Sequence, residues 1–505
     1  MTGGRKAALL LAVTVAVLLA AGSCSVAAVK DSVVVSMPGE ISTLLSWEAN
    51  DQGAHSVNSN VYDTLIRRET SGTLSPALAT EWSYNDDNTE ITFTLRKGVK
   101  FHNGDEMTAD DVVFSFNKAI ESRYAARMTG AFKTMEKIDD SRVKLILKFP
   151  YAAAIGCVTT VNCGIVNKKA YEADPEGFPR NPVGTGPYKL VEWKTGESIA
   201  LEAFEGYYRK PAAIKRLTFR VISDKAAALV ALETGQTNVQ NTPATSDQEY
   251  IVNNPKLQFK STPASAFYFL AFNNSKGAFA EHKALREAAA YAIDPEAILL
   301  GALDGQGVLT PSPIPLGVKF APENFAGYEY NPEKSKQVLE KNGLLGHKIK
   351  VLCMEAGYDV KVTEVVVEQL RQGGFDAEQV IMERTAYLAD VYTNSQYEIA
   401  VNSYTAYYPD ADFIMYMRYH SKHLGGGNNF VMVNNPELDK LLDLARESQD
   451  DAVRAKAYLD ACNLMKKEFV LVPICQYMVA VAAQADLKGL EASNTNRIYA
   501  YDFSW

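Results

Sequence analysis

The segment "ITFTLRKGVKFHNGDEMTADDVVFSF", residues 91–116, contains the pattern of a strand, a turn and a helix within one short stretch. Apolar and polar residues alternate over 91–96, as in a strand with one buried face. An Asn-Gly dipeptide at 103–104 is typical of tight turns, and Thr108 is a residue type that caps helices. The segment therefore predicts a β-strand, a turn and a helix that packs on a core.

Polar side chains crowd the middle of this segment: they are His102, Asp105, Glu106, Asp110 and Asp111. Such a cluster could be a metal site, an acid–base pair or part of the scaffold. Asp110 and Asp111 fall in the predicted first helical turn, where the helix dipole favours negative charge. Asp111 also stands three residues after Thr108, the spacing of a capping box. We therefore expect the acids to stabilise a helix start, and we predict no catalytic residue.

Strand and helix patterns alternate along the rest of the chain. Strands are predicted at 31–38, 142–149 and 214–222, and helices at 224–235, 281–293, 362–375 and 436–448. This alternation predicts an α/β protein with mixed sheets and flanking helices.

The composition is that of a globular protein of 505 residues, 47% of them hydrophobic and 22% charged. The length predicts about three domains. The net charge is −9 and no run of Lys or Arg stands out, so we expect no nucleic-acid partner. No Gly-x-Ser-x-Gly, Walker-type phosphate loop or His-Glu-x-x-His motif is present, so an enzyme is not expected.

The N-terminus has the pattern of a secretory signal. Two cations at positions 5 and 6 precede an apolar run over 7–21, which is too short for a comfortable membrane span. "AGSC", ending at Cys24, resembles a lipobox, although Ala21 stands where Leu is usual. We predict a signal peptide over 1–23 and a lipidated Cys24, with an ordinary cleavage site as the alternative. The mature protein is then exported, soluble and attached to the membrane by lipid alone.

Five cysteines remain beyond Cys24, so at least one has no partner within the chain. Cys157 and Cys163 could bridge a short turn, since export permits disulfides. Two buried thiols that act as small apolar groups are the alternative. No Cys-x-x-Cys is present, so a structural zinc site is not expected.

Residues 91–116 resemble the signature of the extracytoplasmic solute-binding proteins of ABC importers, in the peptide/nickel-binding family (solute-binding protein family 5). Further blocks resemble the same family in the expected order. They are "NVYDTLIRR" (60–68) with "LSPALATEW" (74–82), "NPVGTGPYKLVEWKTGESIALEAFEGYYRKP" (181–211), "ALETGQTNV" (231–239), the region 268–298, "YPDADF" (408–413) and "NNPELDKLLDLA" (434–445). The resemblance spans almost the whole mature chain.

The resemblance implies a type II periplasmic-binding-protein clamp with an additional inserted domain. A discontinuous domain I would comprise 24–62, 182–263 and 466–505. Domain II would be an insertion over 63–181, and domain III would comprise 264–465. The solute would lie between domains I and III, which close on it about a hinge.

Peptide-binding members of the family carry an Asp just before the Tyr-Pro-Asp block, where it receives the α-ammonium group. This chain has Tyr407 there, and Arg384 stands at a position that often carries Trp. Arginine suits a carboxylate, phosphate or planar group, and the tyrosines offer flat faces with hydroxyl groups. The ligand-binding residues implied are Arg384, Tyr404, Thr405, Tyr407, Met37 and Trp47. Tyr408 and Asp410 are expected to be structural.

We therefore predict a monomeric solute-binding subunit that captures a peptide or peptide-like solute and delivers it to an ABC permease and ATPase complex. No cofactor and no metal are expected. One alternative is a sugar-like, anionic or metal-chelate solute in the same clamp, because the usual amine receptor is missing. A second alternative is a signalling or chaperone-like binder that takes no part in transport.

Overall fold

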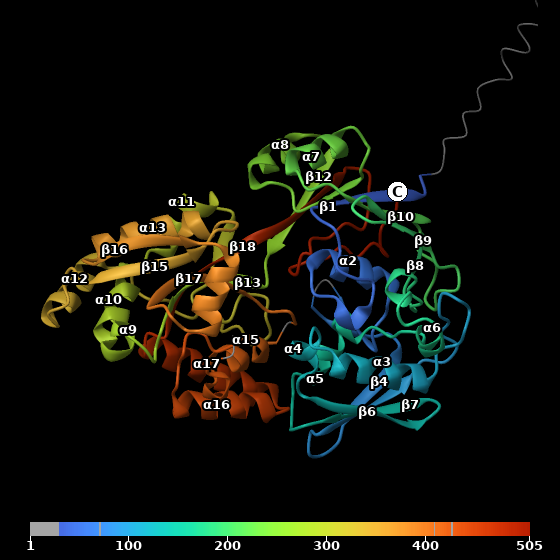
Figure 1. Cartoon of the computed structure of the whole chain (residues 1–505), viewed down its shortest axis with the longest axis horizontal. Coiled ribbons are helices and arrows are strands. Elements are labelled where there is room, and N and C mark those ends of the chain that lie inside the picture. Colours follow the sequence, from blue (N-terminus) through green and yellow to red (C-terminus); the bar gives the residue numbers. More distant parts are fainter. Residues whose placement is uncertain (1–29, 70–71, 409, 426–427) are drawn as a thin grey trace, which may run out of the picture.

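The computed structural model describes residues 30–69, 72–408, 410–425 and 428–505, which form two lobes (Figure 1). The predicted signal peptide and Cys24 lie outside the described residues. A sheet of 12 strands runs through both lobes. In spatial order its main path is β16 (Asp376–Met382), β15 (Lys348–Met354), β17 (Ile399–Thr405), β13 (Ala266–Phe272), β18 (Leu471–Gln484), β11 (Val239–Asn241), β1 (Ser32–Met37), β10 (Arg216–Val221), β9 (Ser198–Ala203) and β8 (Tyr188–Lys194).

Two further strands, β12 (Leu257–Pro263) and β14 (Gly307–Leu309), pair with β18 beside this path. We call the part built on β1 and β8–β12 the first lobe, and the part built on β13–β17 the second lobe. In Figure 1 the first lobe is on the right and the second on the left. The pairing is mixed: β1 runs parallel to β10 and β11, whereas β18 runs antiparallel to all its partners.

The long strand β18 joins the two lobes. Its residues 471–475 pair with β13 of the second lobe, and its residues 478–484 pair with β12 of the first. The partner changes where β12 ends and β13 begins, around Ala264 and Ser265. Two antiparallel strands therefore connect the lobes at this point, which is the geometry of a hinge.

The segment that opens the sequence analysis folds as predicted. Its strand is β5 (Glu90–Leu95), in a four-stranded antiparallel sheet with β4 (Ala79–Tyr84), β7 (Arg142–Leu147) and β6 (Phe132–Asp139). Its helix is α3 (Ala109–Glu121), and the capping box between Thr108 and Asp111 is present. The side chains of Phe93, Phe101 and Phe116 are 0% exposed. Each buried aromatic ring stabilises the fold by roughly 1.5–3 kcal/mol.

His102, which lies between strand β5 and helix α3, has a structural role: it forms hydrogen bonds to the chain before β8. Its Nδ1 accepts a hydrogen bond from the Gly184 amide at 3.3 Å, and its Nε2 lies 3.1 Å from the Gly186 carbonyl oxygen. The amide of His102 also donates to the Gly184 carbonyl at 3.0 Å. These bonds attach the signature segment to the chain that returns toward β8.

The first lobe also holds two short strands and the helices that surround its sheets. These elements are β2 (Ile66–Arg68), β3 (Leu74–Pro76), α2 (Gln52–Val61), α4 (Ala126–Thr129), α5 (Ala154–Val158), α6 (Lys168–Ala173), α7 (Lys225–Glu233) and α8 (Gln248–Asn253). Helix α2 is capped by Asp51, whose carboxylate accepts from the Ala54 amide.

The helices of the second lobe follow the predicted apolar spacing. They are α9 (Ala278–Glu281), α10 (Lys283–Ala292), α11 (Pro295–Leu303), α12 (Pro332–Lys341), α13 (Asp359–Gln372), α14 (Arg384–Tyr387), α15 (Asp412–Tyr419), α16 (Pro436–Glu447) and α17 (Asp451–Lys467). In α13, Val362, Val366 and Leu370 recur every four residues and are 0% exposed. The α/β prediction is confirmed, as are the helices predicted at 281–293, 362–375 and 436–448, which correspond to α10, α13 and α16.

Cys157 and Cys163 are free and buried, so of the two alternatives the buried thiols hold. The Cys163 thiol is directed at the Cys157 carbonyl oxygen, 3.6 Å away. Burial raises the pKa of the Cys163 thiol to about 12. Among the described residues, no helix combines the length and apolarity needed to cross a membrane.

Candidate functional site

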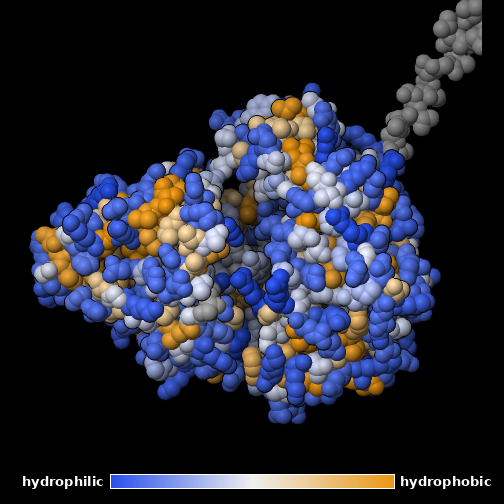
Figure 2. Space-filling model, in the orientation of Figure 1, coloured by the Kyte–Doolittle hydropathy of each residue, from blue (hydrophilic) through white to orange (hydrophobic). Residues whose placement is uncertain are grey.

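A cavity of about 320 Å³ lies where residues of both lobes meet, and we call it the interlobe cavity. Figure 2 shows a hollow between the lobes. Tyr407 is the contribution of the second lobe to the cavity wall among the described residues. The first lobe contributes the rest: Ser59, Asn60, Tyr62, Asp63, Thr64, Arg67, Arg68, Glu69, Thr159, Thr160, Val161, Pro187, Tyr207, Gly489, Glu491, Arg497, Tyr499, Tyr501 and Asp502.

Three arginines line this cavity, and they differ in how they are paired. Arg67 forms ion pairs with Glu69 at 3.2 Å and with Asp502 at 3.4 Å. Arg68, at the end of β2, donates one hydrogen bond to the Asn494 side-chain oxygen at 3.1 Å. Arg497 is 8% exposed, and its Nε has no hydrogen-bond partner in the described part of the chain.

Asp63 is a partly buried acid in the same wall, and its Oδ2 atom is buried. Burial raises the pKa of its carboxyl to about 7, against the opposing effects of the Arg67 charge and a hydrogen bond from Tyr207. The Tyr207 hydroxyl donates to Asp63 Oδ1 at 3.3 Å, while Oδ2 has no partner within the described residues. Asp63 is therefore only partly ionised near neutral pH.

A second cavity, of about 210 Å³, lies at the hinge, and we call it the hinge cavity. Thr405, at the end of β17, lines it together with residues of β18 and of both lobes. The Thr245 hydroxyl of the first lobe is hydrogen-bonded to the Tyr358 hydroxyl of the second at its wall. A change in the lobe angle must therefore alter contacts around this cavity.

The structure separates the predicted ligand-binding residues. Tyr407 lines the interlobe cavity and Thr405 lines the hinge cavity. Arg384 begins the short helix α14 and is exposed, with Nη1 4.0 Å from the Met354 sulfur. Tyr404 is 7% exposed, and the Arg418 guanidinium carbon lies 3.5 Å from its ring centroid.

Met37 and Trp47 are core residues, at 2% and 4% exposed, and neither lines these two cavities. The Trp47 ring packs edge-on against Phe114 and Tyr171, with centroids 6.1 and 5.4 Å away. These contacts join the chain after β1 to helices α3 and α6. A direct role of either side chain in ligand binding stays a prediction.

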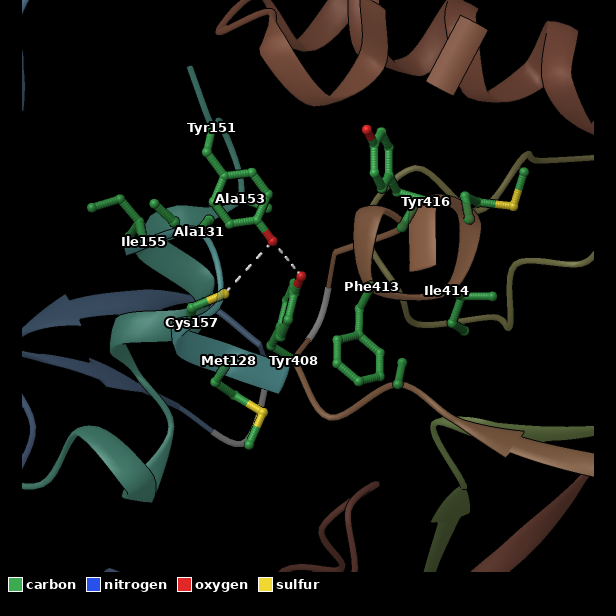
Figure 3. Close-up of a cluster of buried hydrophobic side chains, with 14 of the residues drawn as sticks. Met128, Ala131, Tyr151, Ala153, Ile155, Cys157, Tyr408, Phe413, Ile414 and Tyr416 are labelled. Carbon is green, nitrogen blue, oxygen red and sulfur yellow. Dashed lines mark hydrogen bonds between the residues drawn. The ribbon is translucent and has the colours of Figure 1, made fainter. Parts of the chain in front are cut away.

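Tyr408 is structural, in agreement with the expectation from the sequence. Its hydroxyl lies 2.5 Å from that of Tyr151, and both phenols donate to Asp412 Oδ2, at 3.3 and 2.9 Å. Figure 3 shows Tyr151 and Cys157 of the first lobe facing Tyr408 of the second. Arg446 completes this cluster through an ion pair with Asp412, 3.3 Å from Nε to Oδ1.

Asp410 also serves the scaffold. The Arg454 guanidinium binds both its carboxylate oxygens, at 2.7 and 3.0 Å, and the pair is buried. A two-pronged contact of this kind fixes the position of the chain as well as its charge. It holds the segment between β17 and α15, and with it the backbone that carries Tyr407.

Within the described ranges, no group of three or more His, Cys, Asp or Glu side chains is arranged to hold a metal ion. His420 is 7% exposed and stacks on Tyr416, with ring centroids 4.4 Å apart. Its Nε2 lies 3.3 Å from a carboxylate oxygen of Asp443. These contacts explain the position of His420 as that of a structural residue.

Two lobes joined by a two-stranded hinge, with a cavity between them, define a ligand-binding clamp. Residues 73–426 match the sequence model of the family described as "Bacterial extracellular solute-binding proteins, family 5 Middle". The chain belongs to this family, and both the predicted family and the predicted fold class are confirmed.

Individual relatives are similar over most of their length. The oligopeptide-binding protein AppA of Bacillus subtilis is 28% identical over 84% of this chain and 82% of its own. Heme-binding protein A of Haemophilus influenzae is 26% identical over 85% of this chain and 84% of its own. The solved structure of HbpA2 from Haemophilus parasuis has a TM-score of 0.86 and 22% identity, covering 94% of this chain and 99% of that one.

The interlobe cavity contains residues that the sequence prediction did not select, chiefly Asp63, Arg68 and Arg497. Asp63 and Arg68 stand in the family block "NVYDTLIRR", so a signal was present, but it served only to establish the resemblance. Arg497 lies in the C-terminal segment, outside every block used for the resemblance. Only the fold brings it to Arg68.

Proposed function

We propose that this protein is the solute-binding subunit of an ABC importer, and that it captures a peptide or peptide-like solute between its lobes. Family membership supports the solute-binding class. The observation that carries the proposal is the interlobe cavity, whose wall combines Tyr407 of the second lobe with first-lobe residues. A solute bound there contacts both lobes and favours the closed state, because closure adds contacts that the open state lacks.

Within this proposal, Tyr407 contacts the solute directly and Thr405 senses closure at the hinge. Arg384 is exposed on the second lobe and is available to an anionic part of the solute. Tyr404, Met37 and Trp47 are buried in this structure, and their contact with the solute stays part of the proposal. The missing acidic residue at position 407 makes tight capture of a free dipeptide through its ammonium group unfavourable.

The proposal includes export with a lipid anchor at Cys24 and delivery of the solute to a membrane permease. One alternative keeps the clamp and changes the solute to a sugar-like, anionic or metal-chelate compound. Of these three kinds of solute, the arginines and tyrosines of the interlobe cavity favour the anionic one. A further alternative, a binder for signalling or chaperoning, uses the same capture step without a permease.

Mass spectrometry of the solute that co-purifies with the full chain, followed by calorimetry with the same compound, tests the proposal. We expect a small peptide or peptide-like molecule, and we expect Tyr407→Ala to weaken its binding. Tyr330→Ala is a matched control, since Tyr330 is 43% exposed and lines neither cavity. Tight dipeptide binding that depends on a free amine would contradict the solute class, and equal effects of the two variants would contradict the site.

A further inference from the structure

The interlobe cavity contains two arginines, Arg68 and Arg497, that have no carboxylate within ion-pair distance among the described residues. We propose that Arg68 and Arg497 form a subsite for a carboxylate group of the solute. The inference rests on the proposed function, because it assigns a chemical group to the solute that the clamp would capture. It concerns first-lobe residues that none of the sequence-based expectations includes.

The state of Arg497 is the main observation. The residue is 8% exposed, its buried Nε has no hydrogen-bond partner, and its guanidinium forms no ion pair with any residue in the described part of the chain. A buried cation without a partner is costly, since it loses water and gains nothing in return. Its positive charge, after burial itself, also lowers the pKa of the neighbouring His55, to about 3. An anion in the cavity would supply the missing partner.

Arg68 adds a second guanidinium to the same wall. Within the described ranges its side chain donates one hydrogen bond, to Asn494, which leaves most of its donors for another acceptor. Burial and the nearby positive charge of Arg497 lower the pKa of Arg68, while Tyr499 opposes this effect. Two guanidinium groups that line one cavity, and of which one acts electrostatically on the other, suit a planar carboxylate that accepts from both.

The acids of the cavity do not neutralise this pair. Glu69 and Asp502 bind Arg67 instead. Asp63 is only partly ionised near neutral pH, because burial raises its pKa to about 7. Glu491 is exposed and makes no ion pair within 4.0 Å in the described ranges. The local excess of positive charge at Arg68 and Arg497 therefore remains.

The rest of the wall limits the kind of solute. A volume of about 320 Å³ is near the small end of ligand pockets, roughly 300–1,000 Å³, and suits a compact molecule. Tyr207, Tyr407, Tyr499 and Tyr501 offer aromatic faces and hydroxyl groups beside the arginines. A small peptide-like solute with a free carboxylate fits this combination.

Thermal unfolding of the ligand-free protein gives the first test. If Arg497 serves to bind an anion, it is an unpaired buried charge in the ligand-free protein, and a neutral residue of similar volume removes that charge. We expect the Tm of Arg497→Met to equal or exceed that of the wild type. A structural arginine predicts the reverse. The control Arg216→Met removes an exposed residue of the same lobe, paired with Asp31 at 3.0 Å, and should leave the Tm nearly unchanged.

Binding of defined probes gives the second test. Succinate and the tripeptide glutathione carry free carboxylates, and their dimethyl esters have the same skeletons without these charges. We expect at least one acid to raise the Tm of the wild type at constant ionic strength, while its ester does not. Arg497→Met and Arg68→Gln should each weaken binding of that acid by on the order of 10- to 100-fold, since each removes a charged hydrogen bond.

The outcomes separate this inference from the proposed function. Equal binding of acid and ester, no binding of either acid, or unchanged affinity in both variants would overturn the carboxylate subsite. A markedly destabilised Arg497→Met would make Arg497 a structural residue, and the subsite would then survive only if Arg68→Gln, at the more exposed of the two arginines, weakens binding of the acid. A solute that co-purifies but carries no carboxylate leaves the capture function intact and removes the subsite. Acid-selective binding without any captured solute supports the subsite and contradicts the proposed function.

Discussion

The phenol oxygens of Tyr151 and Tyr408 lie 2.5 Å apart, although the two residues belong to different lobes. Both are buried, and both donate to the carboxylate of Asp412, which Arg446 holds from its other side. The backbone carbonyl of Arg446 also accepts from the Ala152 amide of the first lobe at 3.0 Å. The lobes are therefore connected by a buried polar cluster as well as by the hinge.

Replacing Arg446 by Met tests how much this cluster contributes to the free energy of unfolding. Asp412 is 0% exposed, so the variant leaves a buried carboxylate without its cation. We expect a loss of about 3–5 kcal/mol in the free energy of unfolding, measured by urea denaturation. Contacts of the guanidinium with the Tyr416 ring, 3.6 Å from its centroid, are lost at the same time.

Two controls make this result specific. Arg446→Met combined with Asp412→Asn should be less destabilised than Arg446→Met alone, because the unpaired charge is gone. Lys456→Met breaks an exposed ion pair with Asp460 and should cost about 1 kcal/mol or less. Equal losses for Arg446→Met and Lys456→Met would show that the cluster is solvated in solution.

Thr108→Ala tests the capping box of helix α3. The Thr108 side chain accepts from the Asp111 amide, and Asp111 Oδ2 accepts from the Thr108 amide at 2.9 Å. Removing the hydroxyl should lower the free energy of unfolding by about 1 kcal/mol. Thr108→Ser keeps the hydroxyl and should retain most of the stability, and a loss in Ser as large as in Ala would assign the effect to the methyl group.

The capping box was predictable because all its parts stand within four residues of the sequence. Strand β5 and helix α3 were predictable for the same reason, since periodicity and caps are local signals. The arginine pair was not, because Arg68 and Arg497 stand at opposite ends of the chain and meet only through the first lobe. Burial is the second difficulty: Trp47 and Tyr404 have side chains that suit a ligand, but no local sequence signal indicates how deeply they pack.

Acid should destabilise the protein partly through His102. Burial lowers the pKa of its imidazole to about 4. The hydrogen bond to the Gly186 carbonyl opposes this shift by raising the pKa, and the charge of Lys189 lowers it further. Protonation would also place a hydrogen on Nδ1, which accepts from the Gly184 amide. As the pH falls from about 6.5 to 4, the unfolded chain binds a proton that the folded chain does not, so stability falls over this window.

His102→Gln should remove this contribution. The slope of unfolding free energy against pH between 6.5 and 4 should decrease by up to about 1.4 kcal/mol per pH unit, the value for one proton. Urea denaturation at several pH values measures it. His282→Gln replaces an exposed histidine and should leave the slope unchanged. An unaltered acid slope in His102→Gln would mean that the imidazole titrates normally in the folded protein.

Asp63 should make capture of a carboxylate depend on pH. Its pKa of about 7 reflects burial, with Arg67 and the Tyr207 hydroxyl as its charged and hydrogen-bonding neighbours. Below this value the carboxyl is neutral, and above it a negative charge shares the cavity with the solute carboxylate. Binding of glutathione or succinate should therefore strengthen as the pH falls from 8 to 6.

Asp63→Asn should bind with the same affinity at both pH values, close to that of the wild type at pH 6. It should also be more stable than the wild type at pH 8, because it has no buried carboxylate to ionise. Calorimetry at the two pH values decides the point, and binding that weakens toward pH 6 would place the solute carboxylate away from Asp63.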